Sequence, residues 1–374
     1  MKIGKPGGTL EGEEMQRTFD RTAAPGRLSL AAGLTVIITR PLRVPDGWWL
    51  VGGVGAKPRL VLDNDSNDVG CVVADGALTM EHLIVQGDLQ LTRESSDDKR
   101  SVDKPLRRHG VTSRRGRLAL HGVDVRAFAG DGVRVADRGV LDARHCNFSG
   151  CGLRGVRVAG GSALLEDCTA EGNRHGVLVH LATAVLRRVS TTRNRRHGIV
   201  ATHCPDGVHM LRCFSSENGR SGIVLGGSPA SEKINRDWSV EECVSVRNGQ
   251  LGFAVDPTVR GEATALLQRG RIVRSAAIAN GVHGFNVTHA DDVVLDTSVA
   301  IGNTRDGFAI ANSIRVEVRD CDAFRNGVRG VAFYGEADRI ATNRLRGGDL
   351  RLNEKSLHVS RGLLATSSPA RMGR

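Results

Sequence analysis

Apolar residues recur along this chain in a short phrase made of a glycine, an apolar residue, any residue and a second apolar residue. The glycines that open this phrase (the repeat glycines) between residues 130 and 335 are Gly132, Gly155, Gly176, Gly198, Gly222, Gly252, Gly284, Gly307 and Gly330. Successive repeat glycines are 21 to 32 residues apart. A period of this size is typical of a solenoid, in which one repeat cannot bury its apolar face alone.

Three further positions recur in the repeats. Four residues before the repeat glycine, six repeats carry an asparagine: Asn194, Asn218, Asn248, Asn280, Asn303 and Asn326. Nine residues before the glycine stands a cysteine or a serine: Cys146, Cys213, Cys243, Ser275, Ser298 and Cys321. We call this position the cysteine site, and Cys168 also belongs to it. Three residues before the cysteine site the chain is apolar: Leu165, Leu186, Met210, Val240, Ile272, Leu295 and Val318. Asparagine tolerates the left-handed backbone of a tight turn, and stacked asparagines can bond one another.

These positions predict three short strands in each repeat, because the apolar residues alternate in part and are rich in β-branched types. Helical repeats are disfavoured, since no segment of ten residues keeps a 3.6-residue period. We therefore predict an all-β fold, a single-stranded right-handed parallel β-helix. Its expected range is residues 27–352, with an N-terminal tail and capping helix over 1–26 and a C-terminal tail over 353–374.

The capping helix is expected at about residues 9–22, after a loose segment from Met1 to Gly8. Trp48 and Trp49 are adjacent on an expected strand, so only one of them can face the core. The polar stretch 92–108 has no apolar pattern and is expected to be a surface excursion.

The charge balance has two interpretations. The chain has 52 basic and 41 acidic residues, a formal net charge of +11. A basic balance suits a polyanionic partner such as a uronate saccharide or a nucleic acid. The simpler interpretation is an arginine-rich solvated surface, because the two signs are interspersed.

The cysteines and the ends of the chain suggest little additional chemistry. Five of the eight cysteines fall at one position of the repeat, so they are expected to be buried in a stack, not in disulfides or a metal site. We expect no cofactor. No signal-like or membrane-spanning run is seen, which favours a cytoplasmic location.

Two repeats are longer than the others, with insertions at residues 226–237 and 257–268 after the glycine-led strand. Loops on a rigid scaffold often carry function. The residues that leave this strand include Asp256 and His289, which we interpret as an acid–base pair, because a histidine poised by a carboxylate is a plausible general base. Cations on the insertions would stabilise an enolate. The catalytic candidates are Asp256, His289, His203 and Tyr334, and the substrate-binding candidates are Lys233, Arg236, Arg260, Asn286, Thr288, His180 and His283.

Plainer interpretations of these residues stay open. The histidines after the strand can simply end it at a wet surface. His175, His197 and His283 stand directly before a repeat glycine, where a role in the turn is an alternative. A metal at His180 and His203 is disfavoured, because no third ligand is evident.

The phrase from Asn280 to Val287 is similar to a repeat in secreted mannuronan C5-epimerases, which belong to the pectate-lyase-like superfamily of right-handed β-helices, and residues 303–308 resemble it again. The resemblance implies the fold and a site with a Tyr-Gly-Phe-Asp-Pro-His phrase. The aligned stretch here, Ser221 to Gly226, lacks the tyrosine, aspartate and histidine. The next repeat keeps the aspartate expected there, Asp256, while an expected arginine is Val282. The catalytic motif is therefore largely not retained.

The resemblance also implies a second candidate face. In pectate-lyase-like enzymes the substrate groove is lined by the strand that precedes the cysteine site. Here its outward residues are Glu166, Arg187, Leu211, Glu241, Val273, Asp296 and Arg319. Their alternating charges describe an ordinary solvated sheet equally well.

Two functions remain. The first is an enzyme of the lyase, epimerase or isomerase type that moves a proton on an acidic or polyhydroxylated substrate. The alternative is a non-catalytic β-helix that binds saccharide or serves as a scaffold. The expected partner is an acidic saccharide or a small molecule, with neither nucleic acid nor membrane, and the oligomeric state is left open.

Overall fold

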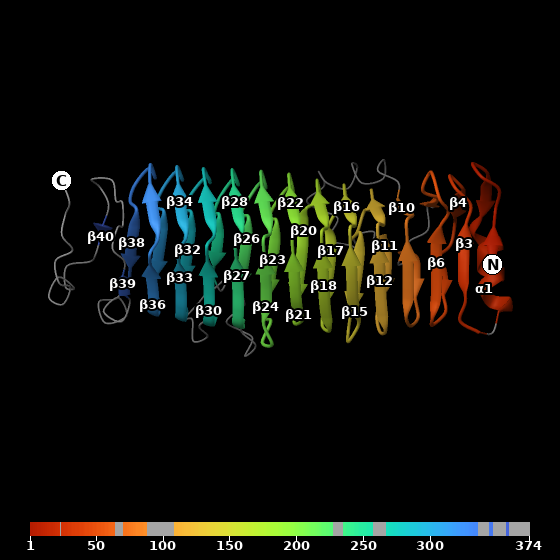
Figure 1. Ribbon diagram of the computed structural model, residues 1–374, viewed down its shortest axis with the longest axis horizontal. Helices are drawn as coiled ribbons and strands as arrows, with labels where there is room; N and C mark the ends of the chain where they lie inside the picture. The colour runs from red at the N-terminus through yellow and green to blue at the C-terminus, as the bar shows by residue number, and fades with distance from the viewer. Residues whose placement is uncertain are drawn as a thin grey trace, which may run out of the picture. The chain divides into compact units, whose positions relative to one another are not determined.

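The computed structural model describes residues 1–22, 24–63, 70–87, 108–226, 235–256 and 267–335, and the short strands β39 (Arg344–Arg346) and β40 (Leu357–His358). The chain forms two compact units, Met1–Arg195 and Arg196–Arg374. In each unit three parallel sheets, named A, B and C here, are built from one strand per turn of the chain (Figure 1). The predicted parallel β-solenoid is confirmed.

The first unit orders its strands strictly by turn. Sheet A contains β1 (Lys2–Ile3), β3 (Arg27–Leu30), β6 (Trp48–Gly52), β9 (Leu78–Glu81), β12 (Arg117–His121), β15 (Val140–Arg144), β18 (Ser162–Glu166) and β21 (Thr183–Arg187). Sheet B contains β2 (Thr9–Glu11), β4 (Thr35–Ile38), β7 (Arg59–Leu62), β10 (Ile84–Gln86), β13 (Asp124–Arg126), β16 (Asn147–Ser149), β19 (Thr169–Glu171) and β22 (Ser190–Thr192). Sheet C contains β5 (Leu42–Val44), β8 (Gly70–Ala74), β11 (His109–Ser113), β14 (Val133–Ala136), β17 (Arg154–Ala159) and β20 (His175–His180).

The second unit follows the same order. Its sheet A contains β24 (Val208–Leu211), β27 (Arg236–Glu241), β30 (Leu267–Val273), β33 (Ala290–Asp296), β36 (Ile314–Arg319) and β39. Its sheet B contains β25 (Phe214–Ser216), β28 (Val244–Val246), β31 (Ala276–Ile278), β34 (Val299–Ile301) and β37 (Asp322–Phe324). Its sheet C contains β23 (Ile199–Thr202), β26 (Ile223–Gly226), β29 (Phe253–Val255), β32 (Phe285–Thr288), β35 (Phe308–Ala311), β38 (Val331–Tyr334) and β40.

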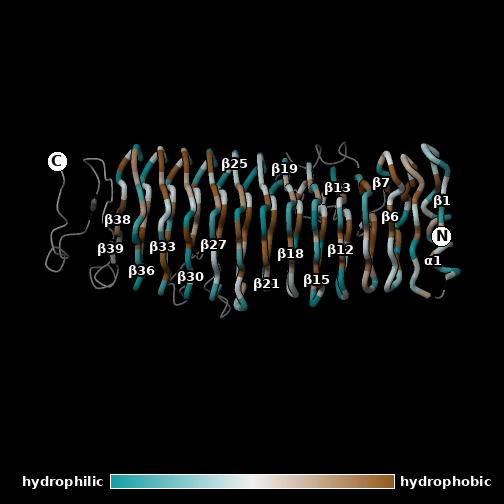
Figure 2. Tube along the Cα trace, viewed as in Figure 1, coloured by the Kyte–Doolittle hydropathy of each residue, from teal (hydrophilic) through white to brown (hydrophobic). Residues whose placement is uncertain are grey.

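The core is a set of stacked identical positions, seen as hydrophobic segments that recur in every coil (Figure 2). The predicted apolar ladder from Leu165 to Val318 is fully buried. All eight cysteines are buried and free, including the five whose burial the repeat predicted. In the second unit Phe253, Phe285 and Phe308 stack with ring centroids 4.7 Å apart and planes within 4° of parallel. Identical side chains stack well because parallel coils place them directly above one another.

The asparagine ladder is confirmed as a continuous hydrogen-bond chain in the second unit. Each side-chain amide from Asn218 to Asn303 donates to the Oδ1 of the asparagine in the next coil, at 2.9–3.0 Å. The same Oδ1 also accepts the main-chain N–H of the preceding asparagine, at 3.0–3.1 Å. These buried donors and acceptors are therefore satisfied within the ladder.

Asn248→Ala is expected to destabilise the protein by about 1–3 kcal/mol for each buried donor of Asn218 that it leaves without an acceptor. The free energy of unfolding in urea measures this loss. Gln250→Ala, at an exposed position two residues away, is the matched control. If the two variants unfold alike, the ladder does not stabilise the fold.

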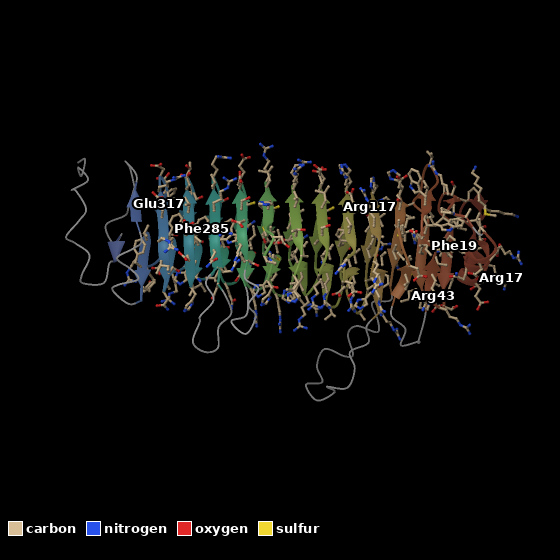
Figure 3. The ribbon with its side chains drawn as sticks, turned by 90° about the horizontal axis from the view of Figure 1, so that it is seen from below. Arg17, Phe19, Arg43, Arg117, Phe285 and Glu317 are labelled. Atoms are coloured by element: carbon tan, nitrogen blue, oxygen red, sulfur yellow. The ribbon has the colours of Figure 1, made fainter. Side chains whose placement is uncertain are left out.

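The N-terminal segment differs from its prediction in detail. The helix α1 (Gly12–Arg21) is shorter than expected, because residues 9–11 pair with β4 as strand β2. The segment Met1–Gly8 is not wholly loose, since β1 pairs with β3. The helix buries Met15 and Phe19, and Phe19 is labelled in Figure 3. The Phe19 ring packs edge-on against Trp48, with ring centroids 4.8 Å apart. Trp48 is the buried tryptophan and Trp49 the exposed one, as the alternation required.

Surface charges pair between neighbouring coils. Arg188 bonds Glu166 and Asp167, Arg271 bonds Glu241, and Arg319 bonds Asp296. The outward strip before the cysteine site therefore carries ion pairs at several of its rungs. Exposed pairs of this kind contribute at most about 1 kcal/mol each. None of the described helices is long and apolar enough to span a membrane.

Candidate functional site

Sheet C of the second unit carries the residues that converge on one another. Its strands alternate, so that the first and third residues after the repeat glycine point inward and the second and fourth point outward. In β32, Phe285 and Val287 are fully buried, while Asn286 and Thr288 are half-buried. The glycine itself must lack a side chain, because a Cβ at Gly284 would lie 2.7 Å from the main-chain oxygen of Gly307. The strip is thus built by close stacking of the main chain.

The residues directly before three successive repeat glycines form the centre of the cluster: His283, Asp306 and Arg329. The Tyr334 hydroxyl, at the end of β38, donates to Oδ2 of Asp306 at 2.5 Å. Nη1 of Arg329 donates to the same hydroxyl at 2.9 Å, and its guanidinium lies 5.9 Å from the ring centroid. The phenol is therefore held between a carboxylate and a guanidinium.

His283 completes the cluster from the preceding coil. Its Nδ1 lies 3.2 Å from Oδ2 of Asp306 and 3.2 Å from the main-chain nitrogen of the same residue. A ring protonated on Nδ1 donates to the carboxylate, whereas a ring protonated on Nε2 accepts the main-chain N–H. The imidazole can hold either tautomer without moving, which suits a group that takes up and releases a proton.

The two acidic groups have opposite pKa shifts. Burial by itself would raise the pKa of Asp306, but the hydrogen bonds from His283 and Tyr334 outweigh it and lower this pKa. Burial, and then the hydrogen bond and charge of Asp306, raise the pKa of Tyr334, which Arg329 only partly opposes. Asp306 is therefore ionised and Tyr334 protonated at neutral pH. Oδ1 of Asp306 is buried without a hydrogen-bond partner among the described residues.

Tyr334 is the only tyrosine of the chain, so its ionisation can be followed directly. Ultraviolet absorbance during an alkaline titration is expected to give a pKa above the ordinary value of about 10. Asp306→Asn should lower this pKa, because it removes the neighbouring negative charge. An unshifted midpoint in the wild-type protein would contradict the described hydrogen bond.

The structure places the other predicted residues of this strip as follows. Nδ2 of Asn286 donates to Oγ1 of Thr288 at 3.0 Å, along β32. Asp256 follows β29, and burial raises its pKa. His180 ends β20 in the first unit, beside Ala159 in register. Arg236 opens β27 with an exposed side chain.

His203 and His289 occupy a different position from the one expected. From the sequence, both are expected on the same side of the solenoid as His180, Asp256, Thr288 and Tyr334, where the chain leaves the glycine-led strand. In the structure both stand five residues after the repeat glycine, at a corner with φ of 56° and 50°. Leu181 and Asn312 hold the same corner in other coils, with φ of 51° and 48°. The corner turns the chain from sheet C to sheet A, so the two histidines belong to a turn position, and pairing of Asp256 with His289 stays a prediction.

Several predictions fall outside the described residues. Lys233 and Arg260 lie there, as do most of both insertions, the polar stretch 92–107 and most of the C-terminal tail. Among the described residues, no three histidine, cysteine, aspartate or glutamate side chains are grouped as a metal site would need.

Sequence reasoning missed Asp306 and Arg329. It assigned His283 mainly to the turn and did not follow the same position into the next two repeats. The signal was present, because three titratable residues stand directly before repeat glycines at intervals of 23 residues. In a solenoid such a spacing places side chains in neighbouring coils, about 4.8 Å apart.

Comparison with known proteins supports the fold. The family model described as "Right handed beta helix region" matches residues 110–256. No curated protein matches the sequence. The mannuronan C-5 epimerase AlgE4 A-module of Azotobacter vinelandii superposes with a TM-score of 0.64 at 15% identity, over 95% of each chain.

Two other solved structures are similar. A double mutant of the periplasmic alginate epimerase AlgG has a TM-score of 0.53 at 11% identity, covering 95% of this chain and 84% of that one. The Dettilon tailspike protein has a TM-score of 0.54 at 13% identity, covering 86% of this chain and 62% of that one. At these identities the likeness establishes the right-handed parallel β-helix and no activity.

Proposed function

We propose that the second unit catalyses proton transfer at the carbon next to the carboxylate of an acidic saccharide. The observation that carries the proposal is the Tyr334 hydroxyl, held between the Asp306 carboxylate at 2.5 Å and the Arg329 guanidinium at 2.9 Å. An imidazole, a carboxylate, a phenol and a cation within one cluster are the groups that carbon-acid chemistry requires. The class of substrate is supported by the names of two similar structures, which describe epimerases of mannuronan and of alginate.

The roles follow from the protonation states. His283, oriented through Nδ1 by Asp306, is the general base and removes the proton from carbon with Nε2. The electron pair moves into the substrate carboxyl group, and the positive charge of Arg329 stabilises the resulting enolate. Tyr334 is the general acid, because its raised pKa keeps it protonated.

The cluster can also restore itself. After Tyr334 gives its proton, the phenolate is left beside Arg329 and Asp306. The imidazolium of His283 can return its Nδ1 proton to it through Oδ2 of Asp306, the oxygen that both groups contact. The ring is then protonated on Nε2, and exchange with water, which removes this proton and supplies one to Nδ1, restores the base. If Tyr334 protonates the carbon, the product is an isomer. If it protonates the glycosidic oxygen while the electron pair forms a double bond, the product is that of a lyase.

Tyr334→Phe tests the proposal. Turnover of oligomers of mannuronan, followed by proton NMR for inverted residues and new double bonds, is expected to fall by about 10²–10⁴-fold. The ring and its packing remain, so the melting temperature should change little. Phe324→Leu, at a half-buried rung of sheet B, is a control for small changes in packing. Equal turnover by Tyr334→Phe and the wild type would exclude Tyr334 as the acid.

A binding function is the second candidate, and the tailspike likeness and the missing epimerase phrase favour it. A wild-type protein that binds oligomers of mannuronan but never converts them would select this candidate.

A further inference from the structure

The triplet of histidine, aspartate and arginine occurs a second time, in the first unit. His109, Asp131 and Arg154 stand directly before Gly110, Gly132 and Gly155, at intervals of 22 and 23 residues. They are thus the same residue types at the same position of three successive coils as in the second unit. Their function is not explained by the proton-transfer cluster, because they belong to another unit.

The histidine–aspartate contacts of this triplet repeat those of the other, whereas its aspartate–arginine contacts differ. Nδ1 of His109 lies 2.9 Å from the main-chain nitrogen of Asp131 and 3.6 Å from its Oδ2. The Oδ1 of Asp131 accepts the main-chain N–H of Arg154 at 3.2 Å, and Nη1 of Arg154 lies 3.5 Å from it. His109 and Asp131 are buried, while the Arg154 side chain is 25% exposed. Arg154 thus reaches the surface, while His109 and Asp131 behind it are buried.

The outward positions beside the triplet differ between the two units. Two residues after the repeat glycine, the first unit has Arg134 and Arg157, which are register partners on β14 and β17. The second unit has Ala309 and Ala332 there. Four residues after the glycine, the first unit has Ala136 and Ala159, where the second has Ala311 and Tyr334. The first unit therefore has added cations and no phenol at these positions.

Several arginines act on one buried carboxylate in this cluster. Arg154, Arg157 and Arg134 all lie close enough to Asp131 to act on its carboxylate electrostatically, although burial still raises its pKa. An acidic ligand that approaches this group of cations is attracted by their positive charge.

The hydrogen bonds are also incomplete. His109 faces two donors, the main-chain N–H of Asp131 at Nδ1 and Nη1 of Arg134, 3.1 Å from Nε2. A neutral imidazole can accept only one of these bonds. Among the described residues, Nε of Arg154 and Oγ1 of Thr112 are buried without a hydrogen-bond partner. An oxyanion that drew the Arg134 guanidinium toward itself would relieve the conflict at His109.

We propose that Arg134 and Arg154, with Arg157 beside them, form a binding site in the first unit for the carboxylate group of an acidic saccharide. Arginine pairs with carboxylates through two parallel N–H···O bonds, which suits a planar group. Asp131 and His109 are positioning residues that hold Arg154 and Arg134 from behind. The site contributes affinity and not chemistry. The inference shares its class of ligand with the proposed function but not its residues.

Calorimetric titration of the full chain tests the site. The probes are an oligomer of mannuronan, a neutral oligosaccharide of the same length, and inorganic phosphate. Arg134→Gln and Arg154→Gln are each expected to weaken binding of the acidic oligomer by about ten- to hundred-fold, as for other charged hydrogen bonds. Arg138→Gln, an exposed arginine of the same unit, should leave binding unchanged. Melting temperatures establish that each variant is folded, and Arg134→Lys replaces any variant that is not.

The outcomes separate the two proposals. Wild-type affinity in both arginine variants overturns the site. Equal binding of phosphate and of the acidic oligomer at this site overturns the saccharide assignment in favour of a general oxyanion site. If binding depends on Arg134 while even the wild-type protein converts nothing, the site stands and the proposed catalysis fails. If conversion occurs and the arginine variants bind normally, the proposed catalysis stands and the binding site in the first unit fails.

Discussion

Asp306→Asn is expected to lower turnover by about 10²–10⁴-fold, the usual contribution of a positioned acid–base group. The amide keeps the shape of the side chain but cannot relay a proton between His283 and Tyr334. Because the pKa of Asp306 is lowered, the wild-type carboxylate is ionised throughout the neutral range, and the loss should be seen at every neutral pH. Initial rates on oligomers of mannuronan measure it.

Stability must be measured beside this activity. A carboxyl group whose pKa is lower in the folded state stabilises the fold above its unfolded pKa, and that stabilisation is lost as the pH falls through the folded pKa. Asp306→Asn should therefore also be less stable at pH 7, so rates are compared per folded molecule. Asp320→Asn, at an exposed bend, is the control. Unchanged turnover per folded molecule would remove Asp306 from the mechanism.

Phe285→Ala is expected to destabilise the second unit by about 3–5 kcal/mol. The Phe285 ring, labelled in Figure 3, is fully buried. It contacts a parallel ring on each side at 4.7 Å, so its removal leaves a cavity between Phe253 and Phe308. Rigid stacked coils cannot close such a gap easily. Urea unfolding followed by circular dichroism measures the change.

Phe214→Ala provides the matched control, because Phe214 is 40% exposed on β25 of the same unit. Phe214→Ala should lower the free energy of unfolding by well under half as much as Phe285→Ala does. Similar losses in the two variants would show that the stacked rings add nothing beyond the size of the side chain.

The fold was predictable because each core position of the solenoid recurs in the sequence of many successive coils. Cysteines nine residues and asparagines four residues before the repeat glycine mark the same point of each coil. The shortening of the capping helix was not predictable, because pairing of residues 9–11 with β4 overrides their compatibility with a helix. Tertiary pairing often decides such borderline segments.

The site was predicted only in part. His283 and Tyr334 were named, and the structure brings them together on Asp306. The intended centre, Asp256 with His289, relied on counting residues that leave a strand. That counting merges two positions, because Asp256 stands four residues after its repeat glycine, whereas His289 stands five residues after its own, at a corner with a left-handed backbone. The backbone at a corner is set by the connection between sheets, which apolar spacing does not reveal.

The central claim is proton exchange at the carbon next to a saccharide carboxylate, with Tyr334 as the acid. The most direct test incubates an oligomer of mannuronan with the wild-type protein in heavy water and locates deuterium by NMR. Deuterium is predicted at the carbon next to the carboxylate in the wild-type reaction, and not in that of Tyr334→Phe. Absence from the wild-type reaction of both deuterium at this carbon and a new double bond to it, or equal uptake with the variant, would contradict the account.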